Sequence, residues 1–63
     1  MIKDIEPERL AQCVNDLFKN RIFKGKRVKE VRLRRSGRGY RAVVVFEDGT
    51  TTEEMLSILL ENL

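Results

Sequence analysis

The chain has 63 residues, of which 41% are hydrophobic and 37% charged, with a formal net charge of +3. This length predicts one small domain, residues 1–63, that buries about 60% of its unfolded surface on folding. Histidine is absent and Cys13 is the single cysteine, which excludes an internal disulfide, the usual zinc sites and the commonest general base. We therefore expect a protein that is not an enzyme and that carries no metal and no cofactor.

Hydrophobic segments of the chain are short. No apolar run approaches the roughly 18 to 20 residues that cross a bilayer. The first residues, MIKDIEPERL, lack the apolar core of a signal peptide. We expect no membrane partner and a cytoplasmic location.

The first predicted element is a helix from Pro7 to Lys19. Proline suits the first turn of a helix, and the acidic residues around it suit the positive end of the helix dipole. Cys13 falls inside the apolar stripe of this helix, so we expect a buried, unreactive thiol. Asn20 is a suitable C-terminal stop, and Ile22 and Phe23 are expected to close the end of the helix. The stripe consists of Leu10, Cys13, Val14, Leu17 and Phe18.

Two strands, Arg27 to Arg35 and Tyr40 to Glu47, follow the helix. A two-residue turn at Gly37-Arg38 predicts an antiparallel hairpin and fixes its register. One face then gathers the strongest apolar residues. On that face Leu33 is opposite Ala42, Val31 opposite Val44 and Arg35 opposite Tyr40. On the other face Arg34 lies beside Arg41 and Arg32 beside Val43.

The C-terminal segment begins with a turn at Asp48-Gly49 and predicts a helix that runs to Leu63. Thr51-x-x-Glu54 matches a capping box, which favours a helix start at this position. An Asp-Gly turn also suits a tight hairpin. A short third strand at Thr50 to Thr52 therefore stays open as an alternative.

These elements predict a two-layer α+β fold in the order α-β-β-α, with an antiparallel hairpin packed against two helices. A two-stranded sheet is thin, and valines on its second face would be exposed. Pairing of two chains in a homodimer would cover them. The residues expected at such an interface are Val28, Val43, Val45, Leu59 and Leu63.

Basic residues concentrate in the middle of the chain. From Lys19 to Arg41 there are eleven Lys or Arg and one acid, Glu30, which leaves a local charge of +10. The flanks are acidic, with −2 over residues 1–18 and −5 over residues 42–63. Arginines that face each other across a hairpin repel by up to about 1 kcal/mol per pair, and phosphate oxygens would relieve that repulsion. The candidate nucleic-acid contacts are Arg32, Arg34, Arg38, Arg41, Lys24, Lys26, Lys29 and Tyr40, the last as a platform for a base.

Two other interpretations of the basic cluster stay open. Lys and Arg on edge strands discourage aggregation between sheet edges. Alternatively, the acidic C-terminal helix of the same chain or of a neighbouring chain neutralises the hairpin.

The segment after the hairpin turn is similar in part to the RNP1 signature of RNA-recognition motifs. Arg38, Gly39, Tyr40 and Val43 fit that signature. Arg41 replaces its small residue, and Ala42 and Val45 stand where the signature places aromatic rings. The element order also resembles double-stranded-RNA-binding domains in outline, but their basic start of the last helix is acidic here. Neither comparison assigns a family.

The sequence thus predicts a small non-enzymatic module whose basic hairpin binds an anionic partner, nucleic acid or another polyanion. The alternative is a protein-interaction or accessory domain, active as a homodimer, whose basic residues only maintain solubility.

Overall fold

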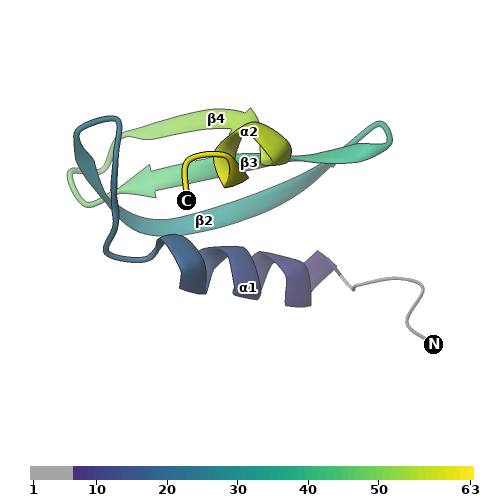
Figure 1. The fold of residues 1–63 in the computed structure, drawn as a ribbon, viewed down its shortest axis with the longest axis horizontal. Helices are drawn as coiled ribbons and strands as arrows, with labels where there is room; N and C mark the ends of the chain where they lie inside the picture. The colour runs from purple at the N-terminus through teal and green to yellow at the C-terminus, as the bar shows by residue number, and fades with distance from the viewer. Residues whose placement is uncertain (1–6) are drawn as a thin grey trace.

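A computed structural model, which describes residues 7–63, contains two helices and an antiparallel sheet with strand order β1-β2-β3-β4. Figure 1 shows α1 along one side of the sheet and α2 over its middle. The α+β class is confirmed, but the sheet has four strands where two or three were predicted. In chain order the elements are α1 (Pro7–Phe18), β1 (Ile22–Phe23), β2 (Lys26–Ser36), β3 (Gly39–Phe46), β4 (Thr51–Met55) and α2 (Leu56–Leu60).

The β2–β3 hairpin has the predicted register. Arg35 pairs with Tyr40, Leu33 with Ala42 and Val31 with Val44. Gly37 has a φ of +58°, whereas Arg38 has no positive φ. This is the pattern of a type II′ turn with glycine at its first position, whose twist matches that of the strands.

A short strand, β1, replaces the predicted closure of α1 by Ile22 and Phe23. Ile22 pairs with Arg27, and Phe23 pairs with Lys26. The connecting residues Lys24 and Gly25 have φ values of 55° and 79°, which is the conformation of a type I′ turn. The predicted stop at Asn20 is confirmed, since α1 ends at Phe18 and Asn20 has a φ of 71°.

The predicted long C-terminal helix is wrong. Thr51–Met55 forms β4, which pairs with β3 from Val45↔Thr51 to Arg41↔Met55, and only Leu56–Leu60 is helical. The Asp48-Gly49 turn reverses the chain beside β3, and backbone pairing there replaces the capping box. The alternative third strand was therefore correct in kind, although it is longer than predicted.

An irregularity in β2 moves one predicted interface residue into the core. Val28 pairs with Phe46, whereas Glu30 pairs with Val45, so the register shifts at Lys29. A β-bulge of this kind inserts one extra residue and resets the alternation of faces. Val28 consequently lies on the core face and is fully buried, which removes it from the predicted interface.

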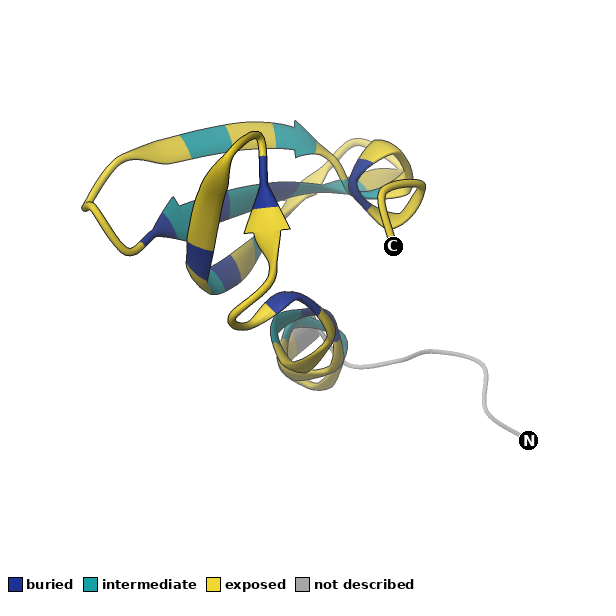
Figure 2. Ribbon diagram, turned by 60° about the vertical axis from the view of Figure 1, so that its left-hand side comes forward, coloured by how far each residue is buried: buried dark blue, intermediate teal, exposed yellow. Residues whose placement is uncertain are grey.

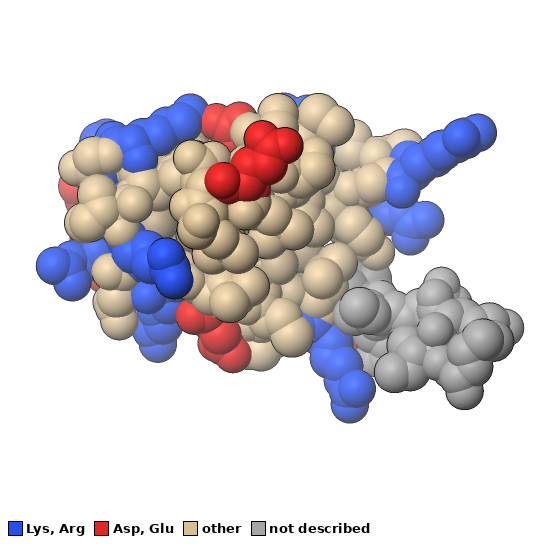
Figure 3. Space-filling view, in the orientation of Figure 1, with Lys and Arg blue, Asp and Glu red and all other residues tan. Residues whose placement is uncertain are grey.

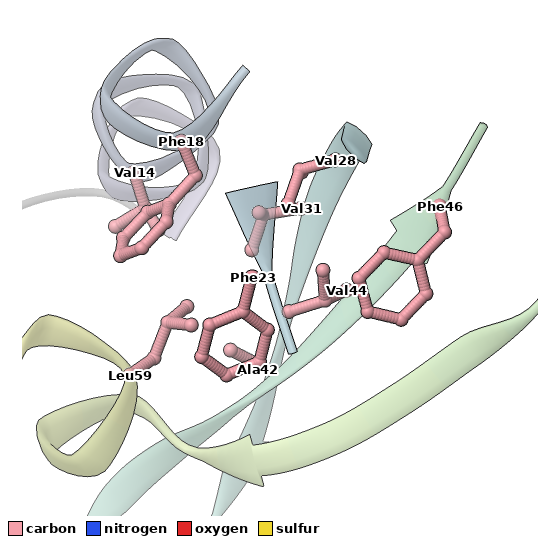
Figure 4. Close-up of a cluster of buried hydrophobic side chains, with 9 residues drawn as sticks. All are labelled: Val14, Phe18, Phe23, Val28, Val31, Ala42, Val44, Phe46 and Leu59. Atoms are coloured by element: carbon pink, nitrogen blue, oxygen red, sulfur yellow. The ribbon is translucent and has the colours of Figure 1, made fainter. Parts of the chain in front are cut away.

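One face of the sheet and both helices share a single apolar core. Figure 4 shows side chains from α1, β1, the sheet and α2 pointing to a common centre. Leu59 of α2 is fully buried there, so it too is removed from the predicted interface. The core residues are Val14, Phe18, Phe23, Val28, Val31, Ala42, Val44, Phe46 and Leu59.

The buried stripe of α1 differs from the predicted one. Figure 2, which views α1 nearly along its axis, shows its buried residues toward the sheet. Asn15 turns the same way, and its side-chain oxygen accepts a hydrogen bond of 2.8 Å from the Val31 N–H on β2. Cys13 is exposed and Leu17 is 45% exposed. The expected burial of Cys13 is wrong because Asn15, a polar residue, takes part of the buried face.

Candidate nucleic-acid interface

The predicted contact residues fall into two groups at opposite ends of β2. Lys24 and Lys26 lie at the β1–β2 turn, whereas Arg38 lies in the β2–β3 turn. The strand between them has 11 residues, a length of about 33 Å at roughly 3.3 Å per residue. Figure 3 shows basic side chains at both ends of the long axis and few between them on the visible face.

The hairpin end holds the arginines among the predicted contacts. We define the tip cluster as Arg34, Arg35, Arg38, Tyr40 and Arg41. Figure 1 shows that the β2–β3 turn projects beyond both helices. Alternation along the strands places Arg34 and Arg41 on the sheet face away from the core, and Arg35 and Tyr40 on the core face. The cluster therefore surrounds the end of the hairpin.

Arg34 and Arg41 converge on Glu53. Arg34 Nη2 and Arg41 Nε donate hydrogen bonds of 2.9 and 2.7 Å to the same carboxylate oxygen, Oε2. The hydrogen bond from Arg41, together with the charge of Arg34, lowers the pKa of Glu53 below its ordinary value of 4.5. Acidic residues of the C-terminal segment thus do neutralise Arg34 and Arg41, as one of the alternative interpretations expected. The acid, Glu53, lies in strand β4 of the same chain and not in a helix.

The remaining arginines of the hairpin differ in their partners. Arg32 is 73% exposed and forms an ion pair of 3.0 Å with Glu30. Arg35 lies over the ring of Tyr40, with its guanidinium carbon 5.6 Å from the ring centroid. Arg38 is exposed in the turn. Within residues 7–63, neither Arg35 nor Arg38 takes part in an ion pair.

Sequence reasoning missed Arg35 and Glu53. The predicted register already placed Arg35 opposite Tyr40 and next to the turn. That position was the signal that could have added Arg35 to the candidate site. Glu53 was assigned to the start of a helix. Its contact with Arg34 and Arg41 follows from the pairing of Val43 with Glu53 in β3–β4, which required the third strand to be recognised.

Two of the predicted contacts at the other end of β2, Lys24 and Lys26, are paired with acids. Lys24 Nζ pairs with Glu54, and Lys26 Nζ lies 3.3 Å from an oxygen of Asp48. Hydrogen bonds from the Thr50 hydroxyl and backbone N–H, with Lys26 nearby, lower the pKa of Asp48 from 3.8 to about 2. Lys29 is exposed at the bulge. Within residues 7–63, Lys19, Arg21 and Arg27 at this end also form no ion pair. What distinguishes the tip cluster is therefore the convergence of two guanidinium groups on one acceptor and not a larger number of unpaired cations.

An apolar hollow of about 280 Å³ adjoins the tip cluster. Tyr40, which is half-buried, forms part of its wall. The structure thus places Tyr40 against α2 rather than beside Arg34 and Arg41. The hollow is lined by Gly39, Tyr40, Met55, Leu56, Ser57 and Leu60.

The other predicted interface residues have different environments. Val43 and Val45 are half-buried on the sheet face away from the core. Leu63 is 53% exposed after the end of α2. These three side chains lie at the surface of the chain.

Comparisons with known proteins add no assignment. No protein-family model, no curated protein and no solved structure matches the chain. In the described part of the chain, no group of three or more His, Cys, Asp or Glu side chains could hold a metal ion. Neither helix of residues 7–63 has the length and apolar character needed to cross a membrane.

Proposed function

We propose that this chain is a small non-enzymatic module that binds nucleic acid through the tip cluster. The contacts are electrostatic and independent of sequence. Arginine suits this role because its planar guanidinium binds phosphate oxygens through two parallel hydrogen bonds. A hairpin turn that projects from the body gives a phosphate backbone access to it.

The observation that carries the proposal is the contact of Arg34 and Arg41 with one carboxylate oxygen. Two guanidinium groups that donate 2.9 and 2.7 Å hydrogen bonds to Glu53 Oε2 are arranged to hold an oxyanion. A phosphate oxygen is an acceptor of the same kind. Glu53 therefore competes with a ligand for these two arginines.

Arg35 and Arg38 make the first contacts in this proposal, because neither is occupied by an acid of the described chain. Arg34 and Arg41 join them when phosphate displaces Glu53. The five arginines of the hairpin end and the two glutamates that pair with them leave a local charge of +3, even with both glutamates in place. The residues counted are Arg32, Arg34, Arg35, Arg38, Arg41, Glu30 and Glu53.

A salt titration tests the proposal. Fluorescence anisotropy of a labelled oligonucleotide should show binding at about 50 mM salt and a dissociation constant that rises with salt. If four phosphates are contacted, the affinity should fall by about 50- to 150-fold between about 50 and 200 mM salt. Binding that is absent at the lower concentration, or indifferent to salt, would contradict the proposal.

Glu53→Gln should increase the affinity. The substitution removes the competing charge and frees Arg34 and Arg41, so the slope of log affinity against log salt should become steeper by about one to two. Glu47→Gln is the matched control, because Glu47 is exposed and forms no ion pair within residues 7–63. Equal effects of the two substitutions would show that only net charge matters and that Glu53 is not a competitor.

A second candidate function, a homodimeric interaction module, is favoured by apolar side chains at the surface. Ile58 is 42% exposed and Leu63 is 53% exposed. Val43 and Val45 form a small apolar patch on the uncovered sheet face. Sedimentation equilibrium tests this candidate: a dimer that Val45→Lys or Leu63→Asp dissociates would support it, and a monomer at all concentrations would exclude it.

A further inference from the structure

The apolar hollow beside the tip cluster is a second element of the interface. It lies between the start of β3 and α2, and its volume is about 280 Å³. Its walls are open to solvent, since Met55 is 51% exposed and Leu60 is 37% exposed. Ser57 is its one hydroxyl besides that of Tyr40. The volume is just below the roughly 300 to 1,000 Å³ of pockets for drug-sized molecules, so it suits a single ring system.

Positive charge adjoins this hollow directly. Arg35 is the cross-strand partner of Tyr40, and its guanidinium carbon lies 5.6 Å from the centre of the Tyr40 ring. Arg38 directly precedes Gly39, which also lines the hollow. An apolar space with an aromatic wall thus lies next to two arginines that no acid of the described chain occupies.

We propose that the hollow receives one unstacked nucleobase of a single strand, while Arg35 and Arg38 bind the adjacent phosphates. This inference rests on the proposed function and names its substrate class. A nucleobase is flat, with two apolar faces, and stacks on aromatic side chains regardless of its identity. A base within a duplex is stacked and paired on both sides and does not reach such a space. The module therefore prefers single strands to duplexes of equal length.

Intrinsic fluorescence gives a direct readout of the hollow. Tyr40 is the single tyrosine of the chain, and there is no tryptophan. Tyrosine emission therefore reports on one side chain, in the wall of the hollow. An oligothymidylate of about ten nucleotides, within the site sizes of known single-strand binders, should quench this emission when it binds. An abasic oligomer of the same length carries the same phosphates and should leave the emission unchanged.

The affinities should follow the fluorescence. Stacking of one base predicts that oligothymidylate binds at least about 5-fold more tightly than the abasic oligomer. Tyr40→Leu keeps an apolar side chain and removes the ring, so it should lower the affinity for oligothymidylate to that for the abasic oligomer. Tyr40→Phe keeps the ring and should retain the wild-type preference.

The outcomes separate this inference from the proposed function. Equal, salt-dependent binding of both oligomers without quenching overturns the nucleobase site and leaves the phosphate contacts standing. Equal losses in Tyr40→Leu and Tyr40→Phe, or a duplex that binds and quenches as well as the single strand, also overturn it. Absence of binding to any oligomer at about 50 mM salt contradicts the proposed function itself.

Discussion

Asp48 fixes the turn between β3 and β4 through contacts that depend on its charge. Its side chain accepts hydrogen bonds from the N–H and the hydroxyl of Thr50 at 2.9 and 2.6 Å. Because these donors lower its pKa from 3.8 to about 2, the folded state favours the ionised form. The stabilisation is complete above the unfolded pKa and is lost as pH falls through the folded pKa.

Asp48→Asn should therefore lower the melting temperature at pH 7 but not at the acidic end of the range. The difference between wild type and variant should shrink as pH falls from about 4 to 2. Melting curves followed by circular dichroism over this range measure it. A difference that persists unchanged at pH 2 would show that the ionised carboxylate is not its source.

Leu59 and Leu63 allow a matched comparison of two leucines near the C-terminus. Leu59 is fully buried and Leu63 is 53% exposed. Leu59→Ala should lower the free energy of unfolding by about 2 to 5 kcal/mol, because it removes buried surface and leaves a cavity. Leu63→Ala should change it by less than about 0.5 kcal/mol. Urea denaturation distinguishes them, and equal effects would contradict the packing of α2.

Burial of single residues was predictable only where the local pattern was regular. Val31 and Val44 follow the alternation of their strands and lie in the core as expected. Val28 does not, because the bulge at Lys29 resets that alternation, and no residue type in the sequence marks a bulge of this kind. Cys13 illustrates a different limit: the helical period was correct, but Asn15, which accepts a hydrogen bond from the Val31 N–H, faces the sheet, and Cys13 is exposed.

The strands of the sheet are joined by tight turns, and the residues of these turns determine how the strands pair. At the β2–β3 turn, Gly37 has a φ of +58°, a conformation that costs other residues roughly 1 to 2 kcal/mol. Gly39, two residues later, has no positive φ, and a side chain there would meet nothing within 4 Å.

Gly37→Ala should destabilise the fold by about 1 kcal/mol, whereas Gly39→Ala should have a much smaller effect. Chemical denaturation of the two variants measures this difference. Equal stabilities would indicate that the turn does not require a left-handed residue at its first position.

Secondary structure was predicted correctly where a turn determined strand pairing. It was predicted wrongly where the same residues fitted both a helix start and a strand. The Gly37-Arg38 turn predicted the register of the central hairpin from Ser36↔Gly39 to Glu30↔Val45, beyond which the bulge shifts it. Thr51-x-x-Glu54 satisfies a capping box, yet its threonines also favour a strand. Pairing with β3 decided between them, and such a tertiary contact is not encoded within the segment itself.

At the scale of the whole molecule, the fold separates the basic residues that form one continuous segment, Lys19 to Arg41, in the sequence. The length of β2 separates Lys26 from Arg38, and two adjacent residues of β4 carry acids to opposite faces of the sheet. Glu54 pairs with Lys24, and Glu53 pairs with Arg34 and Arg41. The sequence showed how much positive charge there is. It did not show which arginines remain free, because that depends on where β4 lies.

The central claim, that the hairpin end binds a phosphate backbone, is tested most directly by reversing its free charges. In the double variant Arg35→Glu and Arg38→Glu, anisotropy titrations should show that the slope of log affinity against log salt falls by about two. The control double variant, Lys19→Glu and Arg27→Glu, makes the same charge change near the other end of β2 and should retain the wild-type slope. Loss of slope and affinity in the first variant alone would support the claim, and equal losses in both, or none in the first, would contradict it.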